Sequence, residues 1–333
     1  MHIPDNYLSP ATCAVMGAAM VPIWATSGGK VKAGLPRTKL PFLGICAAFS
    51  FLIMMFNVPA PGGTTAHAVG GTLIAALVGP WAACIAISVA LLIQALLFGD
   101  GGLLAFGANC FNMAFVIPFL GYFIHTFLKD RARTERGGLI GLGVAAYLAL
   151  NMAALCAAIE FGLQPVIARD LAGLPLYCPY PLSISIPGML LPHLLVAGVA
   201  EALFTVGVYA FIRRVSPGTL YEGARQRVPV IYGVMVALVC CSPLGLLAKG
   251  PAWGEWGVDE IKDLVFGGKP LGFVPSGMAH GFSLKAVCQD YAVTGMPEWA
   301  GYVLSALAGG ALLIIAFKLL GLLRKNQEPA RKA

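Results

Sequence analysis

Charged residues are scarce in this sequence. Only 11% of its 333 residues are Asp, Glu, Lys or Arg, 58% are hydrophobic, and the mean hydropathy is +0.81. A typical soluble domain is about 25% charged, and a globule of this size needs a polar surface that so few charges cannot supply. The composition therefore excludes a cytosolic enzyme, a nucleic-acid-binding module and a disordered scaffold, and it predicts an integral membrane protein.

Motifs for nucleotide binding and for common hydrolytic sites are missing as well. The sequence has no Gly-x-x-x-x-Gly-Lys-Ser/Thr loop, no Gly-x-Ser-x-Gly elbow and no His-Glu-x-x-His helix. We therefore expect that the chain is not an enzyme and does not hydrolyse ATP by itself. Its nine cysteines include no Cys-x-x-Cys pair. Only Cys178 and Cys288 fall in polar loops, and the sequence does not decide whether they form a disulfide.

The start of the chain also lacks the basic region of a signal peptide. Met1-His2-Ile3-Pro4-Asp5 is uncharged until its fifth residue, so we expect no cleavage and a native N-terminus.

Nine apolar segments are candidates for membrane-spanning helices, which need about 20 mostly apolar residues. They are 10–26, 40–58, 65–78, 81–98, 107–128, 139–161, 189–212, 228–248 and 299–323. The third is too short to cross alone as a regular helix. It either stops short of one surface or is completed by irregular backbone, which is tolerated only where it is buried in protein or lines a cavity. We expect an all-α, polytopic membrane helical bundle, with seven spans in residues 1–215 and a two-span C-terminal hairpin with a long external loop in residues 216–333.

The positions of lysine and arginine predict the orientation. If the N-terminus is outside, 17 of the 22 basic residues lie on the inner side. These are Lys30, Lys32, Arg37, Lys39, Lys129, Arg131, Arg133, Arg136, Arg213, Arg214, Arg225, Arg227, Lys318, Arg324, Lys325, Arg331 and Lys332. This bias places the protein in the cell membrane with its N-terminus outside and its C-terminus in the cytoplasm. No internal repeat supports an inverted-repeat transporter.

The first two residues form a candidate metal chelate. The amine of Met1 and the amide nitrogen of His2 close a five-membered ring around a metal, and that amide nitrogen closes a six-membered ring with His2 Nδ1. Three nitrogens in a plane leave one position for a second imidazole. A deprotonated amide suits square-planar Ni(II), Cu(II) or Co(II) better than tetrahedral Zn(II).

His67 is the candidate for the second imidazole. It lies at the end of an uncharged loop rich in proline and glycine, residues 57–71, which leads into the short third span on the same predicted side as the N-terminus. Glycine allows the backbone to approach closely there. Asn57, Thr64 and Thr65 are candidates to orient the imidazoles.

A different interpretation uses ionisable residues inside the predicted spans. His193 and Glu201, with Glu160, would form an intramembrane acid–base site, because buried ionisable groups in membranes are often functional. This alternative makes the protein an intramembrane enzyme, and the competing interpretation is ordinary hydrogen bonding between helices.

Several separated motifs resemble one family. Residues 1–10, the 57–71 loop, and residues 94–103 with 107–113 are similar to the CbiM/NikM family, the substrate-capture (S) components of energy-coupling-factor nickel/cobalt transporters. The resemblance covers roughly residues 1–214. Residues 228–333 resemble the NikN-like accessory part of NikMN-type fusions, through Asp290-Tyr-Ala-Val-Thr-Gly295, although Trp253-Gly-Glu-Trp-Gly stands where a Pro-Asp-Gly-Leu-Glu-like run is expected.

This resemblance implies a function and partners. It implies a metal site made by Met1, His2 and His67, with no cofactor and with Ni(II) or Co(II) as the transported substrate. It also implies a lipid bilayer, a transmembrane T component and cytoplasmic ATP-binding-cassette ATPases as partners, and no nucleic acid. The choice between nickel and cobalt stays open, as does the alternative of a vitamin-binding S component.

Overall fold

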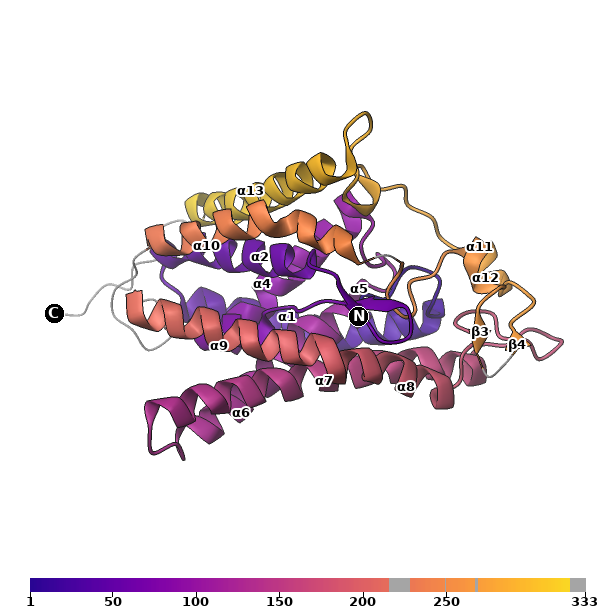
Figure 1. Ribbon diagram of the computed structural model, residues 1–333, viewed down its shortest axis with the longest axis horizontal. Coiled ribbons are helices and arrows are strands. Elements are labelled where there is room, and N and C mark those ends of the chain that lie inside the picture. Colours follow the sequence, from indigo (N-terminus) through magenta and orange to yellow (C-terminus); the bar gives the residue numbers. More distant parts are fainter. Residues whose placement is uncertain (216–227, 249, 267–268, 324–333) are drawn as a thin grey trace.

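The computed structural model describes residues 1–215, 228–248, 250–266 and 269–323. The predicted all-α membrane bundle is confirmed (Figure 1). Within the described residues, six helical stretches are long and apolar enough to cross a membrane. They are Pro10–Gly34 (α1), Pro80–Phe98, Phe106–Lys129, Glu135–Ile167 (α7), Leu182–Val215 and Glu298–Leu323 (α13).

Three of these stretches contain a π-helical segment. The helix α4 (Pro80–Ile93) continues as Gln94–Phe98, and Cys110–Val116 joins α5 (Phe106–Asn109) to α6 (Ile117–Lys129). The segment His193–Ala197 joins α8 (Leu182–Pro192) to α9 (Gly198–Val215). Such segments are rare and are frequently found at functional sites. Here the first two flank residues 99–109, which contact the N-terminal segment.

The remaining predicted spans are shorter. They are α2 (Leu40–Met54), α3 (Gly71–Val78), and α10 (Val228–Cys241), which a 3₁₀ turn, Ser242–Leu247, extends. The third span is as short as its sequence predicted, because α3 has only eight residues. The hairpin of β1 (Val58–Ala60) and β2 (Thr64–Ala66) precedes it.

The C-terminal part packs on the first part through α2. In Figure 1, α10 and α13 lie beside α2. Glycines allow this close approach, since a Cβ on Gly309 would lie 2.3 Å from the Phe51 ring and one on Gly44 would lie 2.9 Å from Phe317. Helices α10 and α13 are joined by a long loop, named the external loop after its predicted side. It carries α11 (Val258–Ile261), β3 (Val265–Phe266), β4 (Lys269–Pro270), α12 (Ser276–Ala279) and the turn Gln289–Tyr291.

The two ends of the bundle differ. The α6–α7 turn and the ends of α9 and α13 lie at the left of Figure 1, whereas α11, α12, β3 and β4 lie at the right. The basic residues that end α6 and α9 (Lys129, Arg213 and Arg214) thus share one end. Which membrane face this end occupies stays a prediction, as does the boundary at 215/216.

Some sequence predictions lie outside the described residues. These are the linker 216–227 and the basic residues Arg225, Arg227, Lys249, Arg324, Lys325, Arg331 and Lys332. The pairing of Cys178 with Cys288 does not occur, because both are free thiols.

Candidate functional site

The N-terminal segment lies buried in the bundle. Met1, His2 and Ile3 are each at most 2% exposed, whereas chain termini are usually mobile unless contacts hold them. Ile3 is held on both sides, because its N–H donates to Asn109 Oδ1 at 2.8 Å and its carbonyl accepts from Asn109 Nδ2 at 3.0 Å. The Gly102 N–H donates to the same carbonyl.

Asp5 fixes the next turn of the segment. Its carboxylate accepts the N–H groups of Leu103, Leu104 and Ala105. Gly102 has no room for a side chain, because a Cβ there would lie 2.4 Å from Asp5 Oδ1. Residues 100–109 therefore bind the N-terminal segment, a role that the sequence motif did not reveal.

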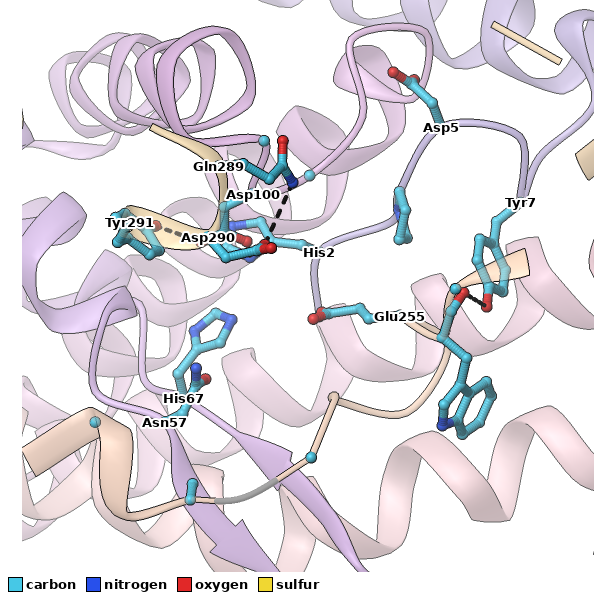
Figure 2. Close-up of a pocket in the computed structure, with 18 of the residues that line it drawn as sticks. His2, Asp5, Tyr7, Asn57, His67, Asp100, Glu255, Gln289, Asp290 and Tyr291 are labelled. Atoms are coloured by element: carbon cyan, nitrogen blue, oxygen red, sulfur yellow. Dashed lines mark hydrogen bonds and ion pairs between the residues drawn. The ribbon is translucent and has the colours of Figure 1, made fainter. Parts of the chain in front are cut away.

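The structure brings the two predicted imidazoles together (Figure 2). The rings of His2 and His67 stack with centroids 4.9 Å apart and an interplanar angle of 27°. His67 Nδ1 lies 3.1 Å from the carbonyl of Ala68, and donation there leaves a lone pair on Nε2. In the described part of the chain, neither Nε2 has a hydrogen-bond partner, although both residues are buried.

The electrostatics keep His67 in the form that binds metals. Burial, and then the positive N-terminus, lower the pKa of His67 well below its usual value. A neutral imidazole is the ligand form, so His67 needs no deprotonation at neutral pH.

Asp100 orients His2. Its Oδ1 lies 2.8 Å from His2 Nδ1, and its Oδ2 accepts from the Tyr291 hydroxyl at 2.5 Å and from Gln94 Nε2 at 3.2 Å. Burial alone would raise the pKa of Asp100, but the His2 imidazole and the hydrogen bonds from His2 and Tyr291 reverse this shift and hold the pKa well below its usual range. The carboxylate thus stays ionised and directs His2 Nδ1 toward itself.

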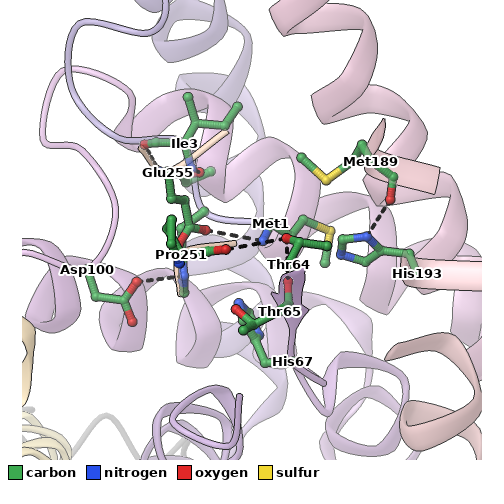
Figure 3. Close-up of polar contacts among 12 residues, drawn as sticks. Met1, Ile3, Thr64, Thr65, His67, Asp100, Met189, His193, Pro251 and Glu255 are labelled. Carbon is green, nitrogen blue, oxygen red and sulfur yellow. Dashed lines mark hydrogen bonds and ion pairs between the residues drawn. The ribbon is translucent and has the colours of Figure 1, made fainter. Parts of the chain in front are cut away.

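Glu255 of the external loop contacts the N-terminal amine. Its Oε1 lies 3.5 Å from Met1 N (Figure 3), and 24% of its side chain is exposed. Burial raises the pKa of Glu255, although the positive amine opposes this shift. The amine and this carboxyl group thus form an ion pair at the edge of the cavity.

The three predicted orienting residues have different surroundings. Asn57 lines the same cavity as both imidazoles. The Thr64 hydroxyl donates toward the carbonyl of Pro251 at 3.4 Å, and Thr65 forms a parallel bridge with Ala252. The two threonines thus join the His67 loop to the C-terminal part, and their effect on the imidazoles stays a prediction.

A cavity of about 890 Å³ opens beside these groups. Its lining includes His2, His67 and five carboxylates, namely Asp5, Asp100, Glu255, Asp290 and Glu298. Among the described lining residues none is Lys or Arg. A cavity of this charge attracts cations.

The residues of the alternative acid–base site have separate partners. His193 Nδ1 lies 2.7 Å from the Met189 carbonyl, and Glu160 accepts from Asn112. Glu201 accepts from the backbone of Val69 and Gly70. Within the described residues, no hydrogen bond joins any two of the three, so the structure gives this alternative no proton-transfer pair.

A metal at the N-terminus would need backbone ligands. In the described ranges, no group of three or more His, Cys, Asp or Glu side chains is arranged to hold a metal ion. The two imidazoles with the amine and the amide nitrogen make four donors, provided that the His2 ring turns Nδ1 away from Asp100. Sequence reasoning assigned no role to Asn109, Asp100, Tyr291 and Glu255. The first three lie in motifs that carry the family resemblance, and Glu255 lies where the loop departs from the expected pattern.

Comparison with known proteins shows the family of the chain. Residues 2–219 match the CbiM family, described as cobalt uptake substrate-specific transmembrane region, and residues 227–326 match the PDGLE domain. The chain is 52% identical over 326 residues to a probable fused nickel transport protein, LarMN, of Lactiplantibacillus plantarum, with 97% of each chain covered. It is 47% identical over 340 residues to the fused nickel transport protein NikMN of Rhodobacter capsulatus, with 96% of each covered.

A solved structure is similar as well. The crystal structure of a truncated transition metal transporter is 51% identical, with a TM-score of 0.61, and the match covers 64% of this chain and 99% of that one.

Proposed function

The chain belongs to the CbiM family, and from this premise we propose that it is the metal-capturing membrane subunit of a nickel or cobalt uptake transporter. The matches over residues 2–219 and 227–326 confirm the resemblance found in the sequence. The proposal depends above all on one observation, the buried N-terminus with His2 stacked on His67.

Four nitrogens are the proposed ligands. They are the Met1 amine, the His2 amide nitrogen, His2 Nδ1 and His67 Nε2. A donor set of two imidazoles, an amine and an amidate suits the square-planar preference of Ni(II), and it also accepts Co(II). Asn57, Thr64 and Thr65 stay proposed as residues that orient the imidazoles.

Metal binding must replace two contacts of the metal-free protein. The amine must leave Glu255 and lose a proton, and the His2 ring must turn Nδ1 away from Asp100. The His2 amide also loses its proton, so one divalent ion replaces two protons. The local charge stays at +1, because an ammonium group beside a neutral amide becomes a divalent ion bound to an amidate. Binding therefore adds no net charge to the buried site.

The acidic cavity is the proposed route to this site. It lies between the N-terminal segment and the external loop, and its carboxylates raise the local concentration of cations. We place this face outside the cell, with the N-terminus, in line with the distribution of Lys and Arg. Delivery inward requires a T component and ATP-binding-cassette ATPases as separate chains, since the sequence has no phosphate-binding loop.

An N-terminal extension tests the proposal. We would measure Ni(II) and Co(II) binding by calorimetry to the native protein, to a variant with one extra residue before Met1, and to a control with that residue added after Ala333. We expect tight one-to-one binding by the native and control proteins, and its loss in the extended one, because the extension moves the amine away from His2. Equal binding by all three would contradict the ligand set. No binding by any of them would contradict the proposed function.

A further inference from the structure

A carboxylate is buried in the membrane-spanning stretch Leu182–Val215. Glu201 of α9 is fully buried, and within the described residues it has no ion pair with a basic side chain. Burying a carboxylate is costly unless donors replace water. Its Oε2 accepts two hydrogen bonds, from the backbone N–H of Val69 at 2.8 Å and of Gly70 at 2.9 Å.

These two N–H groups belong to the turn that carries His67. Val69 follows His67 by two residues, and Gly70 is the N-cap residue that directly precedes α3. The N–H groups at the start of a helix have no partner within the helix, and a negative charge there is favourable. Glu201 therefore links α9 to the backbone next to a proposed metal ligand, over 132 residues of sequence.

The turn has little room to adjust. The Ser50 hydroxyl of α2 donates to the Val69 carbonyl at 2.8 Å. Gly70 has a φ of +74°, and a Cβ there would lie 2.8 Å from the Phe49 ring. A Cβ on Gly71 would lie 2.6 Å from Ile117 of α6. Helices α2, α6 and α9 thus all contact the turn. The contact from α9 is the pair of hydrogen bonds that Glu201 accepts from the N–H groups of the turn.

We propose that Glu201 is a positioning residue for metal capture, which holds His67 Nε2 at the fourth ligand position by binding the N–H groups of Val69 and Gly70. This inference rests on the proposed function. The carboxylate does not bind the metal; it fixes the backbone from which His67 projects, and it ties that backbone to α9.

Substitutions that differ in their acceptor oxygen test this role. In Glu201→Ala the turn loses its acceptor, whereas in Glu201→Gln the amide oxygen still accepts both N–H groups. We expect Glu201→Ala to bind Ni(II) about 10- to 100-fold more weakly, as is typical when a residue that orients a ligand is lost. We also expect its visible Ni(II) absorption band to shift as in His67→Ala, because water replaces the imidazole. Glu201→Gln should keep the native affinity and band.

A double variant and a control separate positioning from stability. If Glu201 acts through His67, Glu201→Ala adds no further loss of affinity to His67→Ala. Glu160→Ala removes another buried carboxylate, one that accepts from Asn112, and should leave the Ni(II) band unchanged. Should Glu201→Ala fail to fold, Glu201→Asp, which withdraws the oxygens by one methylene, should show the same shift of the band.

Two results would overturn the inference. One is a native affinity and band in Glu201→Ala while His67→Ala shows the shift; the other is fully additive losses in the double variant. A native band in His67→Ala itself would instead contradict the proposed ligand set, and with it this role of Glu201.

Discussion

The N-terminal segment and the external loop meet at the same cavity, but different contacts hold them. Hydrogen bonds between side chains and backbone hold the N-terminal segment at Ile3 and Asp5. The Asn109 side chain binds both the N–H and the carbonyl of Ile3, and the Asp5 carboxylate accepts three backbone N–H groups. Two side chains of the loop contact the groups around the proposed ligands. Glu255 contacts the Met1 amine, and the Tyr291 hydroxyl donates to Asp100. The contacts at Ile3 and Asp5 leave the proposed ligands free to bind metal. The contacts of the loop involve the Met1 amine and Asp100. In the proposed mechanism, metal binding breaks the contact of the amine with Glu255 and that of His2 with Asp100.

The backbone of the loop is also strained where it reaches the site. Asp290 and Tyr291 have φ values of +53° and +62°. Such conformations cost on the order of 1–3 kcal/mol each for residues other than glycine, and they persist only where the surroundings impose them. Tyr291 packs between the Phe98 and Tyr302 rings while its hydroxyl binds Asp100. If the proposed ligand set is right, the N-terminal segment is preorganised for the metal, and the loop stabilises the metal-free state.

The largest effect should come from loosening the N-terminal segment. Asn109→Ala leaves the N–H and carbonyl of Ile3 without their side-chain partner, which costs about 1–3 kcal/mol for buried groups and lowers Ni(II) affinity about 10- to 100-fold. Calorimetry of Asn112→Ala, a buried asparagine that binds Glu160 instead, is the control. Native affinity in Asn109→Ala would show that the segment is not preorganised by this contact.

A smaller effect of opposite sign should follow from removing the ion pair of the loop. Glu255→Gln no longer stabilises the ammonium form of Met1, and the local charge is the same before and after binding. We therefore expect Ni(II) affinity at neutral pH to rise about 3- to 10-fold, a change of about 1 kcal/mol. Asp259→Asn, an exposed charge in the same loop, should change little. A fall in affinity that is specific to Glu255→Gln would place its carboxylate among the groups that hold the metal.

The pH dependence of stability should also distinguish the two regions. The pKa of His67 is lowered, so below about pH 6.5 the unfolded chain binds a proton that the folded protein does not, and stability falls as pH falls. The pKa of Glu255 is raised, so its contribution has the opposite sign, and stability falls as pH rises through about 4.3.

Thermal unfolding of the metal-free protein measures both slopes. Between pH 7.5 and 5.5 we expect His67→Ala to lose less stability than the native protein, by at most ~1.4 kcal/mol per pH unit. As the pH rises from 4, Glu255→Gln should lose less stability than the native protein does. Parallel pH curves for the native protein and His67→Ala would contradict the buried, neutral state of His67.

Much of the fold followed from local sequence. Each of the nine apolar segments contains helix. The third helix is short, as the limited length of its apolar segment predicted. The proposed chelate was also a local inference, because a terminal amine, an amide and an imidazole on the second residue are adjacent in the chain. The structure added that His67 stacks on His2, which the loop pattern predicted only as proximity.

The partners of the site were beyond sequence reasoning. Asp100 lies in the 94–103 motif, but the motif assigned it no role. Glu255 lies in the run Trp253-Gly-Glu-Trp-Gly, which departs from the family pattern. Glu201 was assigned only to the alternative acid–base site. Each acts through one contact across a long stretch of chain, such as the 254 residues between Met1 and Glu255 or the 132 between Val69 and Glu201.

The sequence by itself determined that the chain is a membrane bundle, and it predicted a metal chelate at the first two residues, because hydropathy and covalent proximity are local properties. Only the tertiary structure decided which carboxylates face the amine, His2 and the His67 turn. That choice depends on how helices far apart in sequence pack, and a buried charge or N–H group must find its partner wherever the packing places one.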